Sequence, residues 1–123
     1  MGKYEHELCA LEDAGLDDVE TDAALTFVLE FVRGAALAGH AARGARDESG
    51  MTDEEWWEAN APLLARLVDP GDYPTAARVG TAAGEAQRGA YSAEHAWEFG
   101  LERVLDGLQV LVDRRAAART PGA

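Results

Sequence analysis

His6 and Cys9 have the spacing of a metal-ligand pair on one face of a helix. They lie three positions apart, with acidic residues on both sides of them. An imidazole and a thiolate are common zinc ligands, but zinc sites in proteins take three or four such groups. The chain has one cysteine and three histidines, and nothing in the sequence requires His40 and His95 to converge on His6. No metal and no other cofactor are therefore predicted.

The sequence shows no arrangement typical of covalent or phosphate chemistry. It contains no nucleophile elbow, and the run VGTAAGEA at 79–86 lacks the lysine and the preceding strand of a phosphate-binding loop. Among 23 acidic residues, no single pair stands out as a general acid and base. The chain is predicted not to be an enzyme, and a small metal-dependent helical enzyme is the third alternative.

Three polar residues, Thr26, Glu30 and Arg33, lie beside Leu29 in an apolar helical stretch. One interpretation is an exposed ion pair between Glu30 and Arg33, which stabilises a helix by about 0.2–0.5 kcal/mol. The other is a polar anchor pair in an apolar ligand pocket, because such pockets orient their ligand with a few polar groups.

The stretch from Ser92 to Val112 is the strongest helical signal. Ser92 is a good N-cap, and an apolar seam follows at spacings of four, three, four and three residues: Trp97, Leu101, Val104, Leu108 and Leu111. Gly100 and Gly107 lie seven residues apart, and each destabilises a helix interior by about 1 kcal/mol relative to alanine. Two glycines in phase indicate that another backbone approaches this helix closely.

A second long helix is predicted over 17–45. Asp17 and Glu20 have capping-box spacing, and an apolar face follows at Leu25, Val28, Leu29 and Val32, with Phe27 and Phe31 on its flank. Beyond Arg33 almost every residue is small, with Gly34, Gly39 and Gly44 five residues apart. This small-residue surface matches the glycines at 100 and 107, so the two helices are predicted to meet each other or their symmetry mates.

Shorter helices are predicted before, between and after these two. The first covers 3–14 and stops at Gly15, and a second starts at a capping box formed by Thr52 and Glu55. Pro62 is expected to divide that second helix, and a weak alanine-rich helix is expected over 74–88. All predicted elements are helical, so the fold class is all-α.

The charge balance excludes one class of partner. Eleven basic and 23 acidic residues give a formal net charge of −12, and no basic stripe offsets it. Such a field repels phosphate backbones, so the chain itself is not expected to contact nucleic acid. The early acidic residues are interpreted as a solvated face.

A cytoplasmic protein without a membrane partner is predicted. Cys9 is the single cysteine, so no internal disulfide can form and a reducing compartment is expected. The N-terminus lacks a basic region followed by an apolar run, which a secretory signal requires. No apolar run is expected to reach the ~18–20 residues that a helix needs to span a bilayer.

The final helix resembles the last helix of the TetR family of transcriptional repressors. The resemblance is carried by F-G-L at 99–101, two hydrophobic residues at 104 and 105, and G-L at 107–108. The order and length of the upstream helices agree with it. Residues 1–113 therefore resemble the tetracycline-repressor-type C-terminal domain, followed by a flexible tail at 114–123.

The resemblance implies an all-α domain that binds a small hydrophobic effector and forms a homodimer through a four-helix bundle. Its implied interface residues are Gly34, Ala35, Ala38, Gly39, Gly100, Val104, Gly107, Leu108 and Leu111. Its implied ligand-binding residues are Leu8, Leu11, Leu25, Thr26, Leu29, Glu30, Arg33 and Trp56.

The DNA-reading unit of the family has no counterpart in this sequence, so DNA is expected to be reached only through a domain absent from the chain. The leading prediction is the ligand-binding and dimerisation domain of a TetR-type regulator, whose repression a small molecule relieves. A stand-alone dimeric helical bundle that binds a hydrophobic ligand or a protein is the first alternative.

Overall fold

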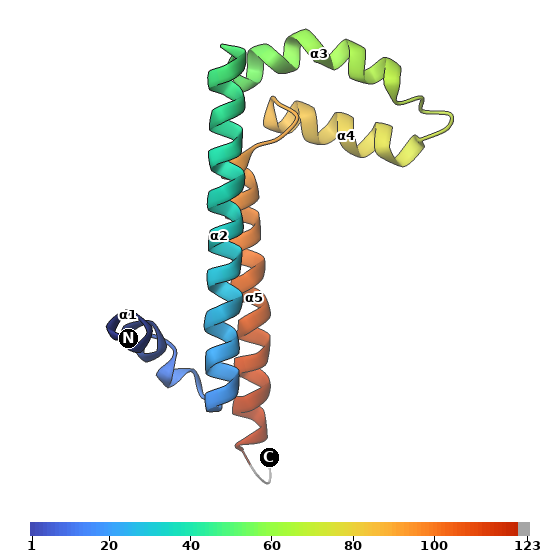
Figure 1. Cartoon of the computed structure of the whole chain (residues 1–123). Coiled ribbons are helices and arrows are strands. Elements are labelled where there is room, and N and C mark those ends of the chain that lie inside the picture. The colour runs from blue at the N-terminus through green and yellow to red at the C-terminus, as the bar shows by residue number, and fades with distance from the viewer. Residues whose placement is uncertain (121–123) are drawn as a thin grey trace. The chain divides into compact units, whose positions relative to one another are not determined.

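The computed structural model describes residues 1–120 and contains helices but, over that range, no strand (Figure 1). The elements are α1 (Gly2–Cys9), a short 3-10 helix η1 (Glu12–Ala14), α2 (Asp18–Ser49), α3 (Asp53–Leu67), α4 (Pro74–Gln87) and α5 (Ala93–Ala118). The predicted all-α class is confirmed.

The chain divides into two compact units where the sequence suggested one domain. The first unit comprises Met1–Ala36 and Trp97–Ala123, and the second comprises Leu37–Ala96. Helix α5 continues to Ala118, well into the segment 114–123 that was expected to be a flexible tail. Residues 121–123 of that segment lie outside the described residues.

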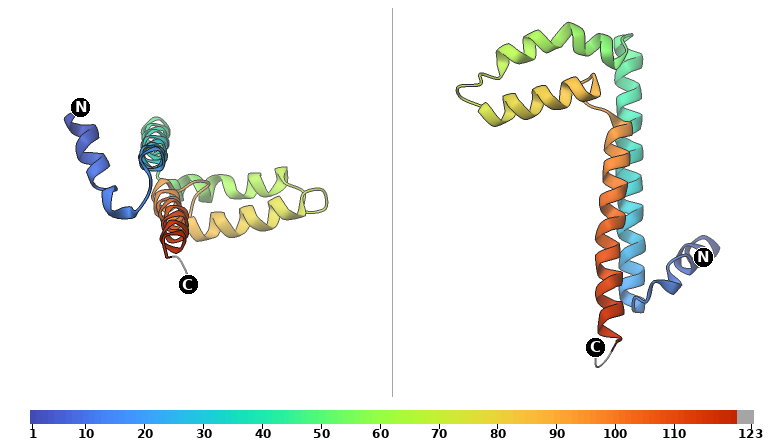
Figure 2. Two further views of the ribbon diagram at one scale, coloured as in Figure 1. Left: turned by 90° about the horizontal axis from the view of Figure 1, so that it is seen from below. Right: turned by 180° about the vertical axis from the view of Figure 1, so that it is seen from behind.

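In the first unit, α5 lies antiparallel beside the early part of α2 (Figures 1 and 2). Its best-buried apolar side chains are Ala24, Leu25 and Val104, which are 4, 8 and 8 % exposed. The rings of Phe31 and Trp97 stack with centroids 5.5 Å apart. The apolar seam of α5 therefore packs against α2 of the same chain.

The N-terminal helix is shorter than predicted. Helix α1 ends at Cys9, and η1 follows before Gly15, whose φ of +79° suits a residue without a Cβ. The capping box at the start of α2 is confirmed, because Glu20 N–H donates to the Asp17 carboxylate at 2.7 Å and Asp17 N–H donates to Glu20 at 3.2 Å.

The second unit contains the end of α2 and an antiparallel pair formed by α3 and α4 (Figure 1). The Thr52 hydroxyl accepts a hydrogen bond from Glu55 N–H at 3.1 Å, which confirms the predicted N-cap. The predicted break at Pro62 is wrong, because α3 continues through it. Pro62 is exposed, so water can satisfy the carbonyl that its missing N–H leaves without a partner.

Helix α2 contains a longer apolar stretch than was expected from the sequence. It contains an 18-residue window with a mean hydropathy of 1.2, so by length and composition alone it could cross a membrane. Core helices of soluble proteins pass the same test. The expectation that no stretch reaches this length is therefore corrected.

Candidate functional site

A cavity of about 360 Å³ lies in the first unit, between α1, η1 and the start of α2. Its lining residues are Tyr4, Glu5, Leu8, Cys9, Glu12, Leu16, Asp18, Thr21 and Asp22. The Tyr4 hydroxyl donates a hydrogen bond to the Asp22 carboxylate, which ties α1 to α2. Leu8 is the predicted ligand-binding residue that this cavity contains.

Four carboxylates line this cavity, and the pKa values of its two weak acids, Tyr4 and Cys9, are raised. The hydrogen bond to Asp22 is the main reason why the pKa of Tyr4 is raised. Desolvation, followed by the charges of Glu5 and Glu12, raises the pKa of the Cys9 thiol. A thiol held in its protonated form is a poor nucleophile and a poor metal ligand. Across residues 1–120, no three His, Cys, Asp or Glu side chains are grouped as a metal site.

The other predicted ligand-binding residues fall into three places. Leu25 is buried, while Leu11 and Leu29 are half-buried in the first unit. Thr26, Glu30 and Arg33 are exposed on the flank of α2 next to Leu29. Trp56 lines a separate cavity in the second unit. The apolar members in the first unit are thus buried or half-buried, whereas the polar trio is open to solvent.

The predicted interface residues also divide into two groups. One group, which comprises Gly100, Val104, Leu108 and Leu111, lies on the seam of α5 that already packs within the chain. At Gly100 a Cβ would lie 2.6 Å from the Phe31 ring, so this glycine permits a contact inside the protomer.

In the other group, Gly34 and Gly107 remain open. A Cβ added at either position would meet nothing within 4 Å. Ala35 is half-buried in the first unit, and Ala38 and Gly39 are half-buried in the second. The two open glycines are therefore the predicted interface residues whose surfaces are free to meet another molecule.

An exposed apolar surface, here named the open face, adjoins these two glycines. Phe27 on α2 is 47 % exposed, and Phe99 and Val110 on α5 are 57 and 48 % exposed. With 100° between successive residues, Phe27 and Gly34 lie to one side of the α2–α5 seam, and Gly107 and Val110 lie to the same side. The spacing placed Phe27 on the flank of an apolar helix face, but it does not reveal which face the partner helix covers.

A pair of arginines near the C-terminal end of α5 holds the turn before α2. The single Nε–H of Arg115 is shared between the two Glu20 carboxylate oxygens, at 2.8 and 3.0 Å, and Arg115 Nη2 donates to one of them as well. Arg119 donates to the Gly15 carbonyl. Hydrogen bonding to Arg115 lowers the pKa of Glu20, and the same bond raises the pKa of Arg115. Sequence reasoning missed this contact, because its partners are 95 residues apart.

At neutral pH, Glu20→Gln is expected to lower the thermal unfolding midpoint, since it removes the ion pair with Arg115 while the amide oxygen can still accept from Asp17 N–H. The folded pKa of Glu20 lies below its ordinary value of 4.5, so its stabilisation is present above that pH and is lost as the pH falls through the lowered pKa. The difference from wild type should shrink in that acidic window. Circular dichroism melts at several pH values measure it.

The exposed carboxylate of Glu102, which pairs with the neighbouring Arg103, is the control for this experiment. Glu102→Gln should change the midpoint at neutral pH less than Glu20→Gln does, because both members of the Glu102–Arg103 pair are exposed. A Glu20→Gln difference that stays constant down to pH ~3 would contradict the assignment.

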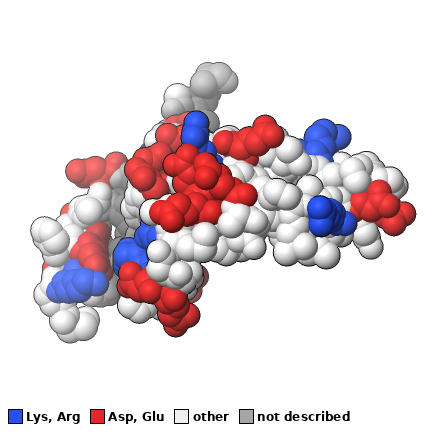
Figure 3. Space-filling model, turned by 90° about the horizontal axis from the view of Figure 1, so that it is seen from above, with Lys and Arg blue, Asp and Glu red and all other residues white. Residues whose placement is uncertain are grey.

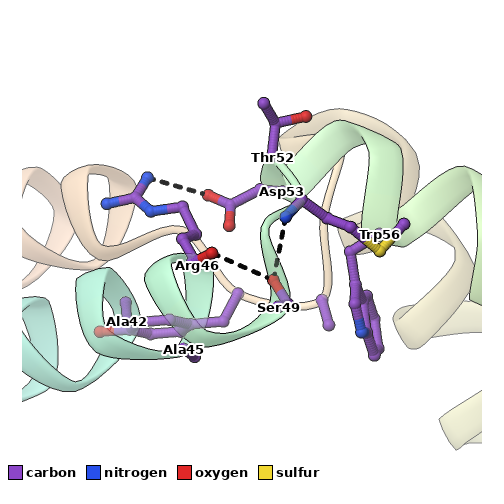
Figure 4. A pocket seen from close by; sticks show the side chains of 10 residues that line it. Ala42, Ala45, Arg46, Ser49, Thr52, Asp53 and Trp56 are labelled. Carbon is purple, nitrogen blue, oxygen red and sulfur yellow. Dashed lines mark hydrogen bonds and ion pairs between the residues drawn. The ribbon is translucent and has the colours of Figure 1, made fainter.

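A second cavity, of about 210 Å³, lies in the second unit at the junction of α2 and α3 (Figure 4). The lining residues are Ala42, Ala45, Arg46, Ser49, Met51, Thr52, Asp53, Trp56, Ala90 and Tyr91. Met51 and Trp56 flank the Thr52 cap as a hydrophobic staple would, and both are half-buried.

Acidic side chains cover much more of the face shown in Figure 3 than basic ones do. This agrees with the net charge of −12 and with the absence of a basic stripe from the sequence. The structure therefore offers no support for direct binding to nucleic acid by residues 1–120.

The chain matches the family described as "Tetracyclin repressor-like, C-terminal domain" over residues 1–112. It is 34 % identical over 121 residues to the HTH-type transcriptional repressor DrrR1 of Streptomyces coeruleorubidus. The alignment covers 98 % of this chain and 43 % of that relative, so the chain spans less than half of the relative's length. No solved structure matches it. With the all-α fold and the F-G-L and G-L steps of α5, these matches show that the chain belongs to the tetracycline repressor-like C-terminal domain family, which is a family of transcriptional regulators.

Proposed function

We propose that this chain is the effector-binding and dimerisation part of a TetR-type transcriptional repressor, and that a small hydrophobic molecule relieves the repression. The observation that carries the proposal is the family match over residues 1–112, supported by the repressor homologue. The role is regulatory and requires no catalysis, and a cytoplasmic location follows from it. DNA contact belongs to a domain outside this chain, because a net charge of −12 repels DNA.

Dimerisation uses α2 and α5 of two copies in a four-helix bundle. The open face supports this assignment, because Phe27, Phe99 and Val110 expose apolar surface that a soluble protomer gains by covering. Gly34 lies on the same side of α2 as Phe27, and Gly107 on the same side of α5 as Val110. A Cβ at either glycine would meet nothing within 4 Å, so another backbone can approach there closely. A two-fold axis places the same patch on both sides, as an isologous dimer requires. Sedimentation equilibrium at micromolar concentration is expected to give a dimer, and a monomer would contradict the proposal.

Effector binding uses the predicted residues around α1 and the adjacent flank of α2. The cavity beside Leu8, at about 360 Å³, lies within the range of small-molecule pockets, which is about 300–1,000 Å³. Leu11, Leu25 and Leu29 supply apolar contacts, and Thr26, Glu30 and Arg33 supply the polar groups that orient a ligand.

The uncharged dye Nile red is a suitable probe of this site. Leu29→Gln is expected to weaken Nile red binding about tenfold, because placing an amide at a half-buried leucine removes roughly 1.5 kcal/mol of apolar contact. Fluorescence titration measures the change, and circular dichroism verifies the fold.

The matched control is Leu63→Gln on α3, where the leucine is exposed and lies outside the predicted site. This control should leave the affinity for Nile red unchanged. Equal losses in the two variants, or no loss in Leu29→Gln, would contradict the assignment of the effector surface.

A further inference from the structure

The cavity at the α2–α3 junction shares no lining residue with the cavity beside Leu8 in the first unit. It lies within the second unit, between the last turns of α2, the first turn of α3 and the segment that leads into α5. In Figure 4 the Trp56 ring and the side chains of Ala42 and Ala45 border one opening. The proposed dimerisation and effector binding leave this opening unused.

Flat and polarisable groups form the walls of this cavity. Trp56 and Tyr91 contribute aromatic rings, Met51 contributes a thioether, and alanines leave room between them. Aromatic rings prefer stacked or edge-on aromatic partners, and thioethers make favourable contacts with ring edges. These walls favour a planar aromatic molecule over a branched aliphatic one.

The size of the cavity limits the ligand to one or two fused rings. Its volume of about 210 Å³ exceeds the ~150 Å³ of an apolar cavity that holds benzene. It is smaller than the ~300–1,000 Å³ of pockets for drug-sized ligands.

Charge balance at the rim favours an uncharged ligand. The Arg46 guanidinium and the Asp53 carboxylate lie 3.4 Å apart and neutralise each other. The Ser49 hydroxyl is also engaged, because it donates to the Arg46 carbonyl and accepts from Met51 N–H, each at 3.2 Å. A charged ligand would find no free counter-charge among these groups, and its desolvation would go uncompensated.

The rim is held in place without a ligand. The Ser49 bonds close the turn after α2, the Thr52 cap starts α3, and the Arg46–Asp53 pair joins the two helices. A site that is already formed loses little conformational entropy when a ligand binds.

From these observations we propose that the α2–α3 junction is a second ligand site, which binds a small, uncharged, planar aromatic molecule of one or two fused rings, stacked on Trp56. Its cavity is smaller than the one beside Leu8, so its occupant is expected to be smaller than the effector.

The test is a fluorine-19 NMR titration of the full chain with 5-fluoroindole as the probe. Saturable binding is expected, and it should weaken about tenfold in Ala45→Leu, because the leucine fills the cavity. Leucine is a good helix former, and Ala45 is an exposed helical position, so this variant should fold. The matched control is Ala65→Leu, at an exposed position of α3 that does not line the cavity, and it should bind as wild type does.

Three results would overturn the proposal. The first is an absence of saturable binding at millimolar probe. The second is tighter binding of 5-fluoroindole-2-carboxylate or 5-fluorotryptamine, which would show that one member of the Arg46–Asp53 pair is free to bind charge. The third is a change of sedimentation in Ala45→Leu, which would show that a second copy of the chain occupies the cavity.

Discussion

Gly107→Leu is expected to convert the proposed dimer into a monomer without loss of helix. In the protomer a Cβ at this position meets nothing within 4 Å, so the substitution does not disturb the folded chain. In the proposed dimer the partner's backbone would fill the same space. Overpacking a close contact costs about 1–3 kcal/mol, and a two-fold interface contains the site twice. Sedimentation equilibrium should therefore show association weakened by at least about 30-fold.

Gly80→Leu is the control for this experiment. Gly80 lies on α4, outside the open face, and a Cβ there also meets nothing within 4 Å. This variant should remain as dimeric as the wild type. If Gly107→Leu leaves association unchanged, or if both variants weaken it equally, the open face is not the dimer interface.

Gly84→Ala is expected to destabilise the second unit, although alanine is the better helix former. A Cβ at Gly84 would overlap the indole ring of Trp57, which packs against this glycine from α3. The ring is rigid and half-buried, so relieving the overlap requires α3 and α4 to separate or the indole to leave its place. The overlap costs about 1–3 kcal/mol.

Gly80→Ala, one turn earlier on α4, isolates this overlap from helix propensity. Both substitutions gain about 1 kcal/mol of helix propensity, but a Cβ at Gly80 meets nothing. The free energy of unfolding, measured with urea, should be about 1–3 kcal/mol lower for Gly84→Ala than for Gly80→Ala. Equal values would show that Trp57 does not pack against α4 in solution.

These glycines show how far residue spacing could predict contacts. The in-phase pair at 100 and 107 predicted that another backbone approaches α5 closely, but within the protomer Gly100 meets a side chain and Gly107 meets nothing. Gly100 accommodates Phe31 of the same chain, whereas Gly107 is open. The two glycines lie seven residues apart on the same side of α5, so helical periodicity gives both the same direction. Their surroundings differ because of where α2 lies along α5.

The sequence predicted helix starts correctly, because each start depends on hydrogen bonds between groups only a few residues apart. Thr52 and Ser92 cap α3 and α5, and Asp17 and Glu20 form the box that starts α2. Pro62 is the exception, because its helix-breaking tendency was overridden in a continuous α3. The family resemblance also came from a local pattern, and the match over residues 1–112 confirmed it.

The sequence by itself determined the all-α class, most helix starts and the family, because each depends on neighbouring residues or on a linear motif. Tertiary structure alone decided which face of α5 the chain covers for itself, which exposed face remains, and that Arg115 reaches Glu20 across 95 residues. It also decided that the predicted ligand-binding residues divide between a buried apolar group and an exposed polar flank. The physical reason is that helical periodicity specifies the direction of a side chain around its own axis, whereas the path of the chain decides what lies in that direction.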